Sequence, residues 1–130
     1  MREIEIYNGQ TRKMMKCVCF NEEQFEADCD TLTIERYKKF NINPKKRLDV
    51  RIEKVVEQIL TGERTLPSRL CLRLESRYAI CNCRIDYVFE IFDMETLNED
   101  MRKAEFSDEE WDKCEKSKPD YVLIYVGMNK

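Results

Sequence analysis

Arginine side chains gather in one short stretch in the middle of the chain, at Arg64, Arg69, Arg73 and Arg77. A guanidinium group offers forked donors that match the oxygens of a phosphate or a carboxylate, and arginine is preferred over lysine where that geometry matters. Every second residue of a strand lies on the same face, about 6.7 Å apart, so the last three arginines are expected to form a row on one sheet face. This row is the most informative candidate for a binding site in the sequence.

Neighbouring side chains extend this candidate site. Thr65 and Ser68 supply hydroxyl donors, and Tyr78 is expected at a hairpin, where its ring would stack on a base. The basic start of a predicted helix at residues 45–47 adds free backbone N–H groups and the positive end of a helix dipole. We expect an anion to be held between the arginine row and this helix start. The predicted ligand-binding residues are Arg64, Thr65, Ser68, Arg69, Arg73, Arg77 and Tyr78.

A structural interpretation of the same arginines is equally consistent with the sequence. Acidic residues lie on or beside the same predicted strands, where they would pair with the arginines across strands, and each exposed pair of this kind contributes little to stability. The acidic residues concerned are Glu63, Glu75, Asp86 and Glu90.

The chain has seven cysteines, an odd number, and no feature of an exported protein, so we expect reduced thiols and a cytoplasmic location. Two pairs, Cys17-x-Cys19 and Cys81-x-Cys83, would each place both thiols on one face of a predicted strand. Four thiolates on neighbouring strands could bind Zn²⁺. However, the spacing differs from the C-x₂-C of common zinc sites, and every position also suits a small core residue. We therefore expect core packing and no metal.

Catalysis is not expected. The chain contains no histidine, which excludes Ser-His and Cys-His nucleophiles and all histidine-ligated metals. Its three scattered glycines form no phosphate-binding loop, and its carboxylate pairs are too ordinary to indicate an acid–base couple. The composition therefore favours a binding protein without a cofactor over an enzyme.

Charge is distributed unevenly along the chain, although the formal net charge is only −3. Residues 38–77 carry eleven basic and five acidic side chains, whereas residues 86–120 carry five basic and thirteen acidic ones. Fields of this size attract opposite charge on a ligand or on another copy of the chain, unless the two segments neutralise each other within the fold. The sequence pI of about 5.2 argues against a sequence-specific nucleic-acid-binding protein.

The N-terminal segments predict strands and short helices. Residues 2–7 alternate polar and apolar side chains and precede Asn8-Gly9, a strong signal for a β-hairpin with a type I′ turn. The return strand is expected over residues 11–20. Short helices are expected from residue 22 and again after residue 33.

The best-marked helix follows, with Asn43 as its N-cap, Pro44 at its first position and Gly62 just after its end. Its apolar stripe consists of Leu48, Ile52, Val55, Val56 and Ile59.

The remaining elements complete the predicted fold. Residues 69–76 and 78–92 read as strands, and an acidic helix begins with a capping box at Ser107 and ends before Pro119. The apolar segment 121–126 reads as a central or covered strand. The order predicts one α+β domain over residues 1–130, with a mostly antiparallel sheet and helices packed on one face. No apolar run approaches the length of a membrane span.

Two stretches of the chain resemble a known family. Residues 7–11 (Tyr-Asn-Gly-Gln-Thr) leading into 16–20 (Lys-Cys-Val-Cys-Phe), and residues 62–69 (Gly-Glu-Arg-Thr-Leu-Pro-Ser-Arg), are similar to small phage proteins that counter the Thoeris defence. The resemblance covers about a fifth of the chain. It implies a non-enzymatic sponge that sequesters a cyclic ADP-ribose-type signal in the host cytoplasm. It also implies a homo-oligomer with ligand sites at subunit contacts.

Two functional hypotheses follow. In the first, the arginine cluster binds and sequesters a phosphorylated nucleotide signal, of the cyclic ADP-ribose or cyclic oligonucleotide type, as a phage counter-defence sponge. In the second, the acidic segment 93–115 mimics nucleic acid and blocks a basic groove on a target protein, as an inhibitor of the anti-CRISPR type. Neutralising Asp108, Glu109 and Glu110 would abolish the second function and leave the first intact.

Overall fold

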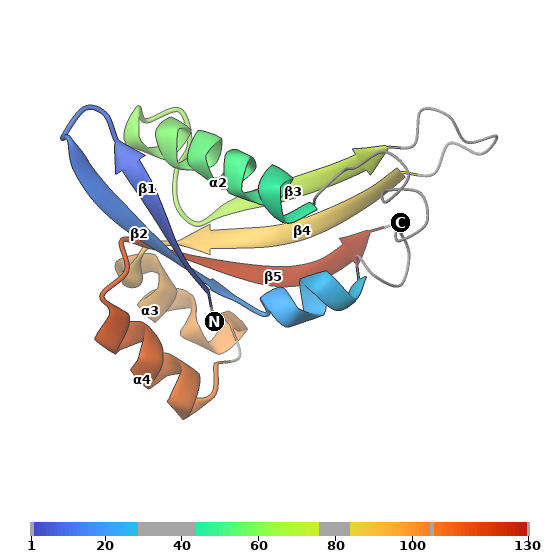
Figure 1. The fold of residues 1–130 in the computed structure, drawn as a ribbon. Coiled ribbons are helices and arrows are strands. Elements are labelled where there is room, and N and C mark those ends of the chain that lie inside the picture. The colour runs from blue at the N-terminus through green and yellow to red at the C-terminus, as the bar shows by residue number, and fades with distance from the viewer. Residues whose placement is uncertain (1, 29–43, 76–83, 105, 130) are drawn as a thin grey trace.

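The computed structural model describes residues 2–28, 44–75, 84–104 and 106–129. A five-stranded sheet forms its centre, with strand order β1-β2-β5-β4-β3. β2 and β5 run parallel, and the other neighbouring strands are antiparallel. The strands are β1 (Arg2–Asn8), β2 (Lys13–Phe20), β3 (Ser68–Glu75), β4 (Arg84–Phe92) and β5 (Tyr121–Asn129). The predicted α+β class with a mostly antiparallel sheet is confirmed, and so is the central place of the last strand (Figure 1).

The predicted N-terminal hairpin is present, but its turn is longer than the two-residue type I′ turn. Strand pairing ends at Asn8 and Lys13. The Asn8 side-chain oxygen accepts a hydrogen bond from the backbone N–H of Gln10 at 3.0 Å, which organises a wider turn. The positive φ of 56° falls at Arg12, so the return strand starts two residues later than predicted.

Helix α2 (Pro44–Leu60) forms where its apolar stripe and its end signals predict it. Leu48, Ile52, Val55 and Val56 are fully or almost fully buried. After the last turn, Gly62 adopts φ +79°, a conformation that glycine takes without strain, and its N–H donates to the carbonyl of Ile59 at 3.2 Å.

The prediction that the helices pack on one face of the sheet is wrong. α2 covers one face, whereas α3 (Met94–Ala104) and α4 (Asp108–Ser117) lie on the other (Figure 1). The reason is that β2 and β5 are apolar on both faces and need cover on each. Cys17, Cys19, Tyr121, Leu123 and Tyr125 join the α2-side cluster, and Val18, Phe20, Val122 and Ile124 join the second cluster.

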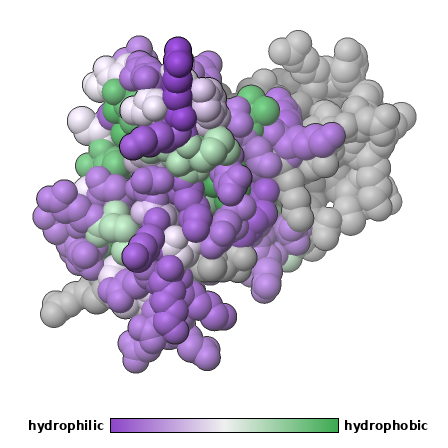
Figure 2. Space-filling model, turned by 60° about the vertical axis from the view of Figure 1, so that its left-hand side comes forward, coloured by the Kyte–Doolittle hydropathy of each residue, from purple (hydrophilic) through white to green (hydrophobic). Residues whose placement is uncertain are grey.

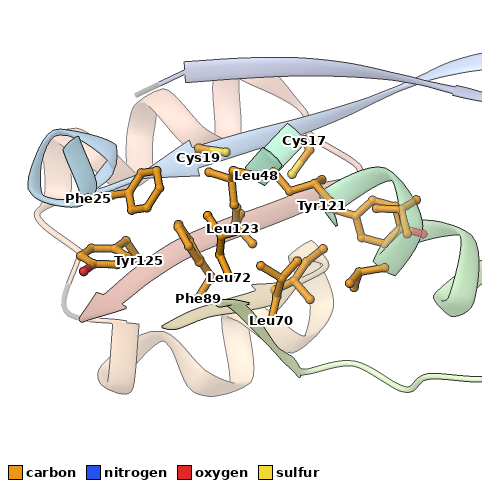
Figure 3. Close-up of a cluster of buried hydrophobic side chains, with 14 of the residues drawn as sticks. Cys17, Cys19, Phe25, Leu48, Leu70, Leu72, Phe89, Tyr121, Leu123 and Tyr125 are labelled. Atoms are coloured by element: carbon orange, nitrogen blue, oxygen red, sulfur yellow. The ribbon is translucent and has the colours of Figure 1, made fainter. Parts of the chain in front are cut away.

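The α2-side cluster is the larger core, and Figure 3 shows its side chains. Residues 22–28 form a helix that inserts Phe25 into it. The Phe25 ring meets the rings of Phe89 and Tyr125 at centroid distances of 5.1 and 5.5 Å. The Tyr125 hydroxyl then donates to the Asp28 carboxylate at 2.5 Å. This helix start was predicted; the helix expected after residue 33 lies outside the described residues.

The second cluster is closed by α3 and α4. The predicted N-cap of α4 is present, because the Ser107 hydroxyl accepts from the backbone N–H of Glu110 at 3.2 Å. The Glu110 carboxylate accepts from the Ser107 hydroxyl at 3.1 Å, in place of the backbone N–H that a full capping box uses. Helix α3 was not predicted. It starts with a reciprocal cap in which the Asp93 carboxylate accepts from the N–H of Thr96 at 2.7 Å and the Thr96 hydroxyl accepts from the N–H of Asp93 at 3.0 Å.

The strand predicted over residues 78–92 is seen from Arg84, since residues 76–83 lie outside the described part of the chain. Val88 and Phe92 are buried like Tyr87 and Phe89, so β4 is covered on both faces.

None of the described helices is long and apolar enough to cross a membrane. On the face shown in Figure 2, hydrophilic side chains cover most of the surface, and hydrophobic ones form small, separate patches.

Candidate anion-binding groove

The Arg64 side chain is hydrogen-bonded within the protein and stabilises the fold. Its Nε donates to the side-chain oxygen of Gln58 at 3.0 Å, and its Nη1 donates to the Ser68 hydroxyl at 3.2 Å and to the Arg69 carbonyl at 3.0 Å. The side chain therefore fastens the end of α2 to the start of β3. This use of the guanidinium and of the Ser68 hydroxyl competes with the ligand contacts predicted for both.

Two members of the arginine row, Arg69 and Arg73, lie opposite acidic residues, as the structural interpretation expects. Arg69 pairs in register with Glu90, and its Nη2 is 3.8 Å from the Glu90 carboxylate. The Arg69 side chain is 63% exposed, so this ion pair is weak. Arg73 is placed by its backbone register alone, opposite Asp86.

Arg69 and the basic start of α2 lie on different faces of β3. Leu70 and Leu72 point into the core beneath α2. Because successive side chains of a strand alternate between its two faces, Arg69, which directly precedes Leu70, points to the opposite face. The predicted anion between the two groups is therefore not supported by this arrangement. Thr65 is exposed in the preceding loop. Arg77 and Tyr78 lie outside the described residues.

A second basic surface, separate from the arginine row, lies beside the edge strand β3. A groove of about 730 Å³ runs between α2 and β3. Four cationic side chains of α2 line it together with one exposed apolar side chain of the helix and two residues of β3. The lining residues are Lys46, Arg47, Val50, Arg51, Lys54, Cys71 and Leu72. We call this the basic groove.

Helical spacing brings these cations together. Arg47, Arg51 and Lys54 are separated by four and three residues, which places them on one flank of the helix. The basic first turn of α2 is predicted from the sequence, but its continuation to Arg51 and Lys54 is not. The signal was present as an i, i+4, i+7 pattern of cations beside the apolar stripe.

The basic groove keeps most of its positive charge. Among the described residues, the ion pairs within 4 Å do not include Arg47, Arg51 or Lys54. The nearby carboxylate of Asp49 is engaged by Arg2 on the other side of α2, at 2.9 Å. The groove also lies beside the first turns of α2, the positive end of the helix dipole, and that first turn contains no acidic residue.

Apolar surface accompanies the charge. The Val50 side chain is 66% exposed on α2, and Cys71 is exposed on β3, while Leu72 is almost fully buried at the groove's base. An anionic group can bind the cations while a flat, weakly polar group packs on Val50. This combination suits an organic phosphate better than a bare inorganic ion.

The described cysteine pair belongs to the core. Cys17 and Cys19 are buried on the α2 side of β2 (Figure 3). The hydrogen bond with Cys17 and burial both raise the pKa of the Cys19 thiol well above its ordinary value, which disfavours the thiolate that a metal needs. Within the described ranges, no group of three or more Cys, Asp or Glu side chains is placed to hold a metal ion. Cys81 and Cys83 lie outside those ranges.

The chain was also compared with known proteins. No protein-family model matches it, and no curated protein or solved structure matches it either. The resemblance to the phage anti-Thoeris proteins therefore stays a prediction.

Proposed function

We propose that this chain is a non-catalytic binding protein that holds a phosphorylated nucleotide in the basic groove. The observation that carries the proposal is the convergence of Lys46, Arg47, Arg51 and Lys54 on one groove of about 730 Å³. A volume of this order is typical of small-molecule sites. The cations would bind phosphate oxygens, with the two arginines offering bidentate donors.

The nucleotide class follows from the apolar part of the groove. A base or a ribose can lie against the exposed Val50 side chain while the phosphates reach the cations. Binding without turnover is proposed because the chain has no histidine and the groove is lined by cations, apolar side chains and one thiol. We propose that the protein acts by sequestering its ligand in the cytoplasm.

We also propose which nucleotides are candidate ligands and which other surface could bind them. The cyclic ADP-ribose-type signal implied by the family resemblance is one member of the nucleotide class, and cyclic oligonucleotides are another. The arginine row is the competing site for either ligand, because Arg69 is exposed on the face of β3 opposite α2 and Arg73 follows four residues later on the same strand. Variants at the two places distinguish them.

The test is thermal stability of the purified protein with a panel of cyclic dinucleotides, cyclic trinucleotides, cyclic ADP-ribose isomers and inorganic phosphate. Ligand at a hundred times its dissociation constant adds about 2.7 kcal/mol of stability, which raises the Tm by several degrees in a small domain. We expect at least one nucleotide to do so, to exceed phosphate, and to be recovered unchanged after the protein is denatured.

Matched variants locate the binding. The double variant R51Q/K54Q should abolish the shift, whereas K113Q/K116Q, which neutralises two exposed lysines on α4, should retain it. Loss of the shift in R69Q/R73Q instead would move the site to the arginine row. Absence of any shift with every nucleotide would contradict the proposed function.

A further inference from the structure

A second cavity lies on the other flank of α2, away from the basic groove. It measures about 420 Å³ and lies between the second half of α2 and the end of the β1–β2 hairpin. Its apolar lining comes from both elements and includes Ile6, Met15, Val56 and Leu60. Ile6 and Val56 are buried, and Leu60 is 38% exposed at the edge. We call it the hairpin pocket.

The charge of the hairpin pocket is opposite to that of the basic groove. Glu53 and Glu57 line it from α2 and are both exposed. They are four residues apart, so their carboxylates lie on one flank and repel each other, which disfavours the helix slightly. Among the described residues, no basic side chain forms an ion pair with either of them.

We propose that the hairpin pocket binds a small organic cation with an apolar body, such as an amidinium, guanidinium or ammonium group carried on a ring or an alkyl chain. The body would occupy the space lined by Met15, Val56 and Leu60. The cationic head would lie between the carboxylates of Glu53 and Glu57 and relieve their repulsion.

The same lining disfavours other occupants. Ca²⁺ and Mg²⁺ take about six or more oxygen ligands, whereas, among the described residues, the only carboxylates that line this pocket are those of Glu53 and Glu57, which are both exposed. A phosphorylated ligand would meet like charge. The site is separate from the proposed nucleotide site, because the two cavities share no lining residue and flank α2 on opposite sides.

The test uses benzamidine as the probe and follows backbone amide signals of the whole protein by NMR during titration. Benzamide, which has the same ring and no charge, is the control for the cation, and guanidinium chloride is the control for the apolar body. We expect saturable shifts at Gly9, Glu53 and Glu57 with benzamidine. We expect at least tenfold weaker binding of either control compound.

Variants complete the test. E53Q/E57Q should weaken benzamidine binding at least tenfold, while E109Q/D112N, which neutralises two exposed carboxylates on α4, should leave it unchanged. Both are surface changes, and the amide spectrum reports directly whether each variant is folded. Equal binding of benzamide, unchanged binding to E53Q/E57Q, or shifts confined to other elements would overturn the proposal. So would a concentration-dependent spectrum showing that a second copy fills the pocket.

Discussion

Single side chains in this protein divide into those that hold the fold together and those that leave charge available to a ligand. Arg64 and Arg69 illustrate the two ends of that range. The Arg64 guanidinium donates hydrogen bonds to the Gln58 side chain, the Ser68 hydroxyl and the Arg69 carbonyl. The Arg69 side chain is 63% exposed, and its guanidinium is 3.8 Å from the Glu90 carboxylate. The number of internal hydrogen bonds, not the charge itself, separates the roles of these two arginines.

This difference gives a prediction for stability. Arg64→Ala should lower the free energy of unfolding by about 2 kcal/mol, because hydrogen bonds of a charged group contribute about 1.5–3 kcal/mol. Arg69→Ala should cost less than about 1 kcal/mol, as exposed ion pairs do. Urea denaturation measures both. Equal stability of the two variants would show that Arg64 does not fasten α2 to β3.

A second prediction concerns pH. Burial, together with the nearby Glu115 carboxylate, raises the pKa of the Cys114 thiol from 9.0 to about 11. The unfolded chain therefore loses this proton near pH 9, while the folded chain keeps it until about pH 11. Stability that is fully present below pH 9 should then fall as the pH rises toward 11, by at most about 1.4 kcal/mol per pH unit.

The Cys114→Ala variant isolates this effect. Its loss of stability between pH 8 and pH 10.5 should be smaller than that of the unaltered protein by about 1–2 kcal/mol, because the thiol titrates near pH 9 in the unfolded chain and near pH 11 in the folded one. Cys71→Ala removes an exposed thiol and serves as the control for the loss of a cysteine. Identical slopes for all three proteins would count against a buried, protonated Cys114.

At the scale of elements, the start of α3 is the feature most open to a direct test. Asp93→Ala removes the carboxylate that accepts from the Thr96 N–H at 2.7 Å. Loss of an N-cap costs about 1 kcal/mol, so chemical denaturation should show a decrease of that size. Ser107→Ala at the start of α4 should cost a similar amount. No measurable change in Asp93→Ala would mean that α3 does not depend on this cap.

The caps also explain which elements could be predicted from sequence. α2 carries Pro44 and Gly62 at its ends, and α4 carries a serine–glutamate capping box, so both were predicted. α3 was missed because its cap uses aspartate and threonine and follows β4 directly. The hairpin was predicted, but the Asn8 side chain selects a longer turn than Asn-Gly alone indicates.

The candidate site could be predicted only in part. Clustered arginines and a basic helix start were visible, yet a linear pattern does not tell which face of β3 lies beneath α2. Leu70 and Leu72 pack in the core beneath α2, so the face of β3 that carries them is the one covered by the helix. Arg69 therefore points away from α2. The basic groove is thus a product of tertiary packing between Lys46–Lys54 on α2 and the exposed edge of β3.

Across the whole molecule, the sheet separates two layers of different charge. α2 presents its cations on one side, and the acidic first turn of α4 lies on the other (Figure 1). The nucleotide proposal predicts that D108N/E109Q binds its ligand as tightly as the unaltered protein, measured by calorimetry. A variant that retains the ligand but no longer captures a basic protein target would favour the inhibitor hypothesis instead.

The most direct test of the basic groove uses the thiol that lines it. Alkylation of Cys71 by iodoacetamide, followed by peptide mass spectrometry, reports access to the groove with and without each cyclic nucleotide of the panel. We predict that a nucleotide that raises the Tm slows alkylation of Cys71 at least several-fold, and that it has no such effect in R51Q/K54Q. A stabilising nucleotide that leaves the alkylation of Cys71 unchanged and keeps its full Tm shift in R51Q/K54Q would bind elsewhere and contradict the assignment of this groove.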